Sequence, residues 1–128
     1  MIRTDSALRF RSCFLAAALA LAACLGSSSS RALECPAPQA LSGAGVLKET
    51  PTQMAVAGAF LASGESSKTV PLVEADLRAR YPGVENAELV NYIITAYCPA
   101  VNQAPGTSEA DKKARMDRFV HDLIEMTY

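Results

Sequence analysis

The sequence predicts an all-α protein, a small bundle of about four helices held by one disulfide. Three observations favour this class. Apolar residues recur at helical spacing in several stretches, helix-capping residues precede these stretches, and two cysteines stand far apart outside the apolar N-terminus. From these patterns we expect helices over residues 51–63, 70–80, 86–98 and 108–126.

The N-terminus has the order of charge and hydropathy that is typical of a secretory signal peptide. Residues 1–12 carry Arg3, Arg9 and Arg11, and residues 13–23 are continuously apolar. This apolar run is shorter than the roughly 20 residues that a membrane-spanning helix needs. We therefore expect an exported protein whose residues 1–23 are a signal peptide.

The tetrapeptide Leu21-Ala22-Ala23-Cys24 resembles the lipobox of bacterial lipoproteins. The resemblance implies cleavage before Cys24 and acylation of this cysteine, which would attach the protein to a membrane. Because Leu25 rather than Asp follows the cysteine, it also implies the outer membrane of a Gram-negative cell. Residues 24–34 are then the lipid-attachment site and a flexible tether, and residues 35–128 form a single helical domain.

A second cleavage site leaves an alternative open. Ser30 and Ala32 are small residues at the positions that precede a signal-peptidase cut, with Arg31 between them. Cleavage after Ala32 would release a domain that begins at Leu33 and is soluble in the periplasm or secreted.

Capping residues predict the start of the first helix. Thr50 is the expected N-cap, Pro51 fits the first helical position, and Gln53 completes a capping box. Gly58 and the neighbouring alanines let another helix approach closely. The same small-residue surface has an alternative use in membrane insertion or dimerisation. One face carries three residues at helical spacing: Met54, Gly58 and Leu61.

The second helix is expected to begin at Val70-Pro71, after a polar linker over residues 65–69. Asp76 and Arg80 lie four residues apart, a spacing that supports a solvated helix face. The apolar residues expected to point inward are Leu72, Val73 and Leu77.

The third helix, over residues 86–98, is expected within residues 84–99, the most apolar run outside the N-terminus. Asn86 is the expected N-cap, and Pro99 is expected to end the helix. A strand is the alternative, because the residues of 92–95 favour strands. The helical repeat consists of Leu89, Val90, Ile93, Ile94 and Tyr97.

The last helix is the most clearly amphipathic. Ser108 and Asp111 offer another capping box at its start. The expected apolar stripe contains Met116, Phe119, Val120, Leu123 and Ile124.

Charge and cysteine content limit the function classes. From Leu33 onward the chain has eight basic and twelve acidic residues, a net charge near −4 that gives no basic surface for nucleic acid. Cys13 and Cys24 belong to the leader or anchor, which leaves Cys35 and Cys98 to pair in an oxidising compartment. Closing this loop stabilises the fold by at most about 4 kcal/mol in the chain-entropy estimate. Two separate thiols are the alternative.

Candidate chemistry is sparse. His121 is the only histidine, and Asp117 and Glu125 lie one turn to either side, so these three residues are the metal or pH-switch candidates. Their alternative role is a solvated helix face of mixed charge. The chain has no nucleophile-elbow, phosphate-loop or zinc-protease motif, so we expect no enzyme and no cofactor.

The layout of cysteines and helices resembles that of HdeA-type periplasmic acid-stress chaperones. Cys35 lies early, and Tyr97-Cys98 lies near the end of the penultimate predicted helix, before the helix that follows Ser108. The resemblance implies a soluble, disulfide-held chaperone that responds to acid.

The function expected from these features is that of a non-catalytic exported module of the bacterial envelope. We expect it to be anchored to the membrane through Cys24 and to bind an unidentified protein or envelope component. The chaperone of the HdeA type is the alternative.

Overall fold

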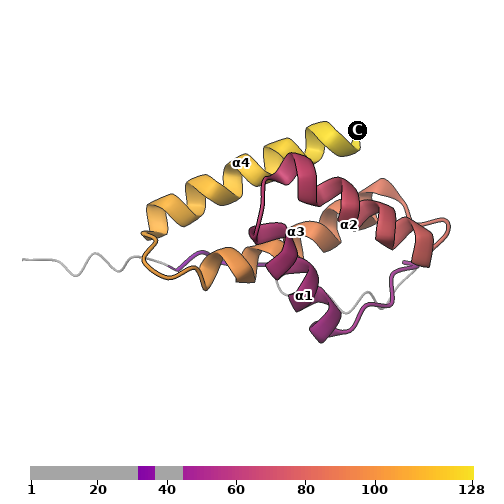
Figure 1. Cartoon of the computed structure of the whole chain (residues 1–128), viewed down its shortest axis with the longest axis horizontal. Coiled ribbons are helices and arrows are strands. Elements are labelled where there is room, and N and C mark those ends of the chain that lie inside the picture. Colours follow the sequence, from indigo (N-terminus) through magenta and orange to yellow (C-terminus); the bar gives the residue numbers. More distant parts are fainter. Residues whose placement is uncertain (1–31, 37–44) are drawn as a thin grey trace, which may run out of the picture.

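Four α-helices follow one another in the part of the chain that the computed structural model describes, residues 32–36 and 45–128. Within these ranges there is no strand (Figure 1). One disulfide joins Cys35 to Cys98. The all-α prediction is therefore confirmed, and the strand alternative for residues 92–95 is wrong. The helices are α1 (Pro51–Ala62), α2 (Ser66–Arg80), α3 (Asn86–Asn102) and α4 (Glu109–Thr127).

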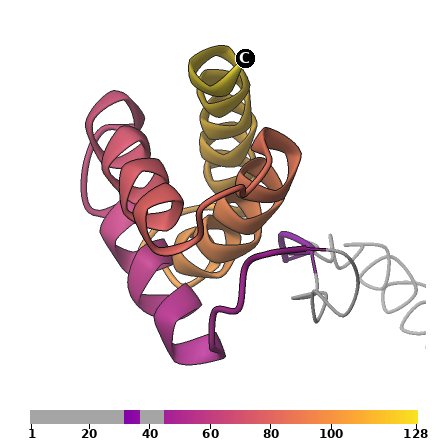
Figure 2. The same ribbon diagram turned by 90° about the vertical axis from the view of Figure 1, so that its right-hand side faces the viewer.

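The helix α3 is the centre of the bundle, and it packs against each of the other three helices (Figures 1 and 2). Its Leu89, Ile93 and Val101 are fully buried. Tyr97 stacks on Phe119 of α4 with the ring centroids 3.6 Å apart. Burying an apolar side chain of this size stabilises a fold by about 1.5–3 kcal/mol, so α3 supplies much of the core.

The prediction that Pro99 ends the third helix is wrong, because α3 continues to Asn102. A proline inside a helix costs about 3 kcal/mol relative to alanine, since it lacks the N–H that would bond four residues back. Tertiary contacts offset this cost here. Val101 is buried, and the Asn102 amide donates to the carbonyl of Leu33 at 2.6 Å.

Asn86 is also not the N-cap of this helix. Glu85 has that position without a side-chain cap bond, and Asn86 is the first helical residue. The Asn86 side chain instead connects three elements. It accepts from Arg78 at the end of α2 (2.7 Å) and donates to the carbonyl of Thr127 at the end of α4 (3.0 Å).

The second helix begins four residues earlier than predicted, at Ser66, and residues 65–69 are not a linker. Its first turns are held by packing that the local sequence does not display. Thr69 and Val70 are buried, and the Ser66 hydroxyl donates to Asp122 of α4 at 2.6 Å. Pro71 lies inside the helix as a result.

Predicted caps at two other helix starts are confirmed. The Thr50 hydroxyl accepts from the backbone N–H of Gln53. In return, the side-chain Oε1 of Gln53 accepts from the backbone N–H of Thr50 at 2.8 Å. Ser108 caps α4 by accepting from the Asp111 N–H at 3.1 Å. Because the capping box restrains the turn that enters α1, it also restrains Glu49, the residue just before it.

Two predicted core residues lie at the surface. Leu72 is 61% exposed and Ile124 is 46% exposed. Leu72 differs in this from its neighbours Val73 and Leu77, which are buried as predicted. In α4 the buried stripe contains Met116, Phe119 and Leu123, with Val120 partly buried at its edge.

The predicted disulfide between Cys35 and Cys98 is present, with their Cα atoms 5.5 Å apart. It joins the segment before α1 to the buried side of α3. The predicted signal peptide of residues 1–23, the lipobox and Cys24 lie outside the described residues.

Candidate binding groove

A groove of about 570 Å³ lies between α1 and α2, with Tyr92 of α3 among its lining residues. On α1, the groove-lining positions 52, 56 and 60 are spaced by four residues, and on α2 positions 72, 76 and 80 repeat the same spacing. Residues four apart lie on one face of a helix, so each helix presents one face as a wall of the groove. The lining consists of Glu49, Thr52, Gln53, Val56, Ala57, Phe60, Leu72, Val73, Asp76, Leu77, Arg80 and Tyr92.

Large apolar side chains are exposed on both walls. Val56 and Phe60 on α1 are 66% and 42% exposed, and Leu72 on α2 is 61% exposed. Single exposed apolar residues are ordinary on protein surfaces, but apolar residues gathered along a groove mark a binding surface. Because these three side chains line one groove, their exposed apolar surface is gathered at one site rather than scattered over the protein.

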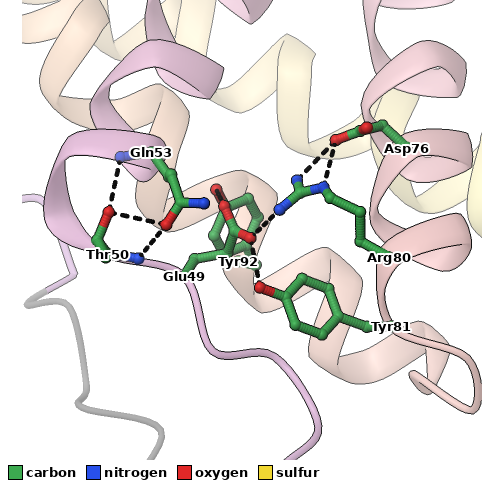
Figure 3. Close-up of polar contacts among 7 residues, drawn as sticks. All are labelled: Glu49, Thr50, Gln53, Asp76, Arg80, Tyr81 and Tyr92. Atoms are coloured by element: carbon green, nitrogen blue, oxygen red, sulfur yellow. Dashed lines mark hydrogen bonds and ion pairs between the residues drawn. The ribbon is translucent and has the colours of Figure 1, made fainter.

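The end of the groove near the start of α1 is polar and centred on Glu49 (Figure 3). The Glu49 side chain is only 2% exposed. It forms an ion pair with Arg80 and accepts hydrogen bonds from the hydroxyls of Tyr81 (2.7 Å) and Tyr92 (3.2 Å). Burying a carboxylate is costly unless it is paired and hydrogen-bonded, and these three partners from α2, α3 and the turn between them meet that requirement.

Asp76 approaches the same guanidinium from the opposite side. Nε and Nη2 of Arg80 donate to its Oδ2 at 2.9 Å and 2.6 Å (Figure 3). The hydrogen bond to Asp76 raises the pKa of Arg80 above its ordinary value, partial burial lowers it, and the bond and charge of Glu49 raise it further. Two carboxylates and one guanidinium leave the polar end of the groove with a net charge of −1.

The two tyrosines remain hydrogen-bond donors at neutral pH. Burial raises the pKa of Tyr92, and the negative charge of Glu49 and its hydrogen bond raise it further. The pKa of Tyr81 is raised first by its hydrogen bond to Glu49 and then by burial. Ionising either hydroxyl would place a second negative charge beside the carboxylate, so both stay protonated.

The metal candidates of the last helix do not form a site. His121 is 70% exposed, with its Nε2 3.7 Å from Glu125, while Asp117 pairs with Lys113 at 2.7 Å. In residues 32–36 and 45–128, no three His, Cys, Asp or Glu side chains come together in a way that would hold a metal ion. The three residues lie on a solvated face of α4.

Sequence reasoning missed the groove and its polar end. Two signals were present in the sequence. Val56 and Phe60 share a second apolar face of the first helix, and Asp76 and Arg80 stand four residues apart, the spacing at which oppositely charged residues of a helix interact. Neither signal reveals that α1 and α2 face one another, or that Glu49 is buried between them. Those are consequences of tertiary packing.

No protein-family model matches the chain, and comparisons with curated proteins and with solved structures gave no significant match. Among the helices of the described residues, none is long and apolar enough to cross a membrane.

Proposed function

We propose that this chain is a non-catalytic exported module of the bacterial cell envelope that binds a partner protein through the groove between α1 and α2. The observation that carries the proposal is the exposure of Val56, Phe60 and Leu72 on the two walls of that groove. Full burial of a side chain of this kind contributes about 1.5–3 kcal/mol, and a docked apolar segment that covers the exposed part of each recovers a share of that energy.

The occupant that fits this groove is an amphipathic helix of the partner with a basic residue at one end of its apolar face. Grooves between two helices take such helices through anchors spaced three and four residues apart, the same spacing as the walls here. The polar end, with Glu49 and Asp76 around Arg80, carries one excess negative charge. This charge favours a Lys or Arg side chain and disfavours a fatty acid or an anionic headgroup.

Export and attachment rest on the sequence. The N-terminal charge pattern supports export, and the lipobox resemblance supports attachment to the outer membrane through an acylated Cys24. Cleavage after Ala32 is the other route, and it would leave the same helical domain soluble in the periplasm.

Photo-crosslinking in an exporting Gram-negative host tests the proposal. A crosslinking side chain at position 60, inside the groove, should capture a protein through a helical segment with apolar residues at helical spacing and a basic residue. The same group at position 124 should not capture it, because Ile124 is an exposed apolar residue outside the groove. A synthetic peptide of the captured segment then allows affinities to be measured.

Leu72→Lys and Asp76→Lys should each weaken this peptide at least tenfold, which corresponds to about 1.4 kcal/mol. Ile124→Lys is the matched control and should leave the affinity unchanged. Equal affinity of the Leu72→Lys variant and the wild type would show that the groove is not the binding site. Equal crosslinking from positions 60 and 124 would show the same.

The second candidate is an acid-responsive chaperone, and the burial of Glu49 favours it. The ion pair of Glu49 with Arg80 and its hydrogen bond from Tyr92 hold α2 and α3 together at the polar end, so losing these contacts would loosen this end of the groove. The disulfide would keep Cys35 and α3 together while the apolar walls separate. In an acid titration, this candidate requires loss of the fold at low pH, together with a gain in binding of an unfolded client protein. A partner-binding module gains no such activity.

A further inference from the structure

Two side chains hold the backbone of Leu33, one at its N–H and one at its carbonyl, in the described N-terminal segment. Its N–H donates to Glu109 Oε2 at 3.1 Å, and its carbonyl accepts from the Asn102 amide at 2.6 Å. The Leu33 side chain packs against the core, whereas Ala32, one residue earlier, is exposed. Two helices therefore fix position 33, and the chain reaches solvent immediately before it.

The Glu109 carboxylate beside the Leu33 nitrogen is ionised and can bind a positively charged group. Its other oxygen accepts from Lys112 at 2.9 Å. This hydrogen bond lowers the pKa of Glu109, the bond from the Leu33 N–H lowers it further, and burial acts in the opposite direction. The carboxylate is ionised at neutral pH. A backbone N–H offers such a carboxylate one neutral donor, whereas an α-ammonium group at the same nitrogen offers three donors and a full charge.

The space around the Leu33 nitrogen is large enough for an α-ammonium group, and the charged residues around it carry a net negative charge. A cavity of about 400 Å³ beside Leu33 is lined by Ala32, Glu34, Glu109, Ala110 and Lys113. The charged groups here are Glu34 next to Leu33 in the chain and, on α4, Glu109 paired with Lys112 and Lys113 paired with Asp117. From α3 the neutral Asn102 contacts the same residue. Three acids and two lysines leave one negative charge, which one ammonium balances.

We propose that Leu33 is the N-terminus of the mature protein and that its α-ammonium group binds Glu109. A peptidase of the exporting cell hydrolyses the peptide bond between Ala32 and Leu33. Water supplies the second oxygen of the new Ala32 carboxylate, and the Leu33 nitrogen leaves as an amine that takes up a proton. Ser30 and Ala32 provide the small residues that such a cut requires. This processing selects the soluble route over a permanent anchor at Cys24, and it does not depend on what the groove binds.

Intact mass and N-terminal sequencing test the cut directly. The full chain is expressed in an exporting Gram-negative host and the mature protein is recovered from both the membrane and the soluble periplasmic fractions. We expect the main species to begin at Leu33. Mature protein that begins only at an acylated Cys24, or at another residue, would overturn the proposal.

The pKa of the α-amino group tests the contact with Glu109, measured by pH-dependent labelling of the folded mature protein. It should lie above the ordinary range of about 7.7–8.0, because the carboxylate stabilises the charged form. Glu109→Gln should return it to that range. Glu34→Gln removes the same charge from the exposed residue next to Leu33, and it should leave most of the shift in place. An ordinary α-amino pKa in the wild-type protein would refute the contact even if Glu109→Gln failed to fold.

Discussion

Gly58 of α1 lies directly against the backbone of Ala96 in α3. A β-carbon built at position 58 would stand 2.0 Å from the Ala96 carbonyl oxygen, closer than any real contact. The absence of a side chain therefore sets how near α1 comes to the central helix. Since α1 is one wall of the groove, this contact also helps to position the binding surface.

Gly58→Ala should destabilise the protein. Alanine is the better helix former by about 0.5–1 kcal/mol, but forcing a methyl group into a packed contact costs about 1–3 kcal/mol. The obstacle is backbone rather than a yielding side chain, so we expect a net loss of about 2 kcal/mol in urea unfolding. Ala59→Gly, at the exposed neighbouring position, isolates helix propensity and should cost about 1 kcal/mol. A stabilised Gly58→Ala variant would show that α1 does not approach α3 this closely.

Loss of the Cys35–Cys98 bond should reduce stability by up to about 4 kcal/mol, because the bond closes a long loop that the unfolded chain otherwise explores. The double variant Cys35→Ala/Cys98→Ala and the reduced wild-type protein should unfold at similar, lower urea concentrations. The double variant itself should be insensitive to reductant. A wild-type unfolding midpoint that does not move on reduction would contradict this role.

Alkali should destabilise the protein through Tyr92. Its folded-state pKa is raised above the unfolded value near 10, so the folded chain keeps a proton that the unfolded chain releases. This contribution is complete below about pH 10 and is lost as the pH rises toward the folded-state pKa. Tyr92→Phe should flatten the fall in unfolding free energy above pH 10. Tyr128→Phe, at the 76% exposed C-terminal residue, should retain the wild-type slope.

Acid should destabilise the protein through Glu109. Because its folded-state pKa is lowered, chiefly by Lys112, its contribution to stability is present above the unfolded pKa near 4.3 and is lost as the pH falls through the folded-state value. Glu109→Gln should reduce the acid dependence of unfolding below about pH 4.5. Glu34→Gln, an exposed carboxylate next to the same segment, serves as the control. Identical acid profiles for Glu109→Gln and the wild type would contradict the assignment.

His121→Ala should leave unfolding free energy and partner binding unchanged within about 0.5 kcal/mol, because the side chain is 70% exposed and lies on α4 outside the groove. Calorimetric titration of the wild-type protein with zinc should likewise show no binding that this substitution removes. Metal binding that depended on His121 would restore the candidate site that the sequence suggested.

The local patterns of the chain were sufficient for most of the fold. The capping box at Thr50 and the N-cap at Ser108 located the starts of α1 and α4 to within a residue, since a cap depends only on residues three positions apart. Cysteine content was enough to pair Cys35 with Cys98. Local rules failed at Pro99 and in residues 65–69. There, buried side chains and contacts with other segments keep locally unfavourable residues helical.

By itself, the sequence determined the helical class, the number of helices, the disulfide and the close approach allowed at Gly58. It determined these because helical periodicity, caps and cysteine pairing are properties of neighbouring residues or of composition. Only the tertiary structure decided that Leu72 is exposed opposite Phe60, that Glu49 is buried beside Arg80, and that Leu33 meets Glu109. Each of these relationships joins residues from different elements, and packing of the whole core sets the distance between them.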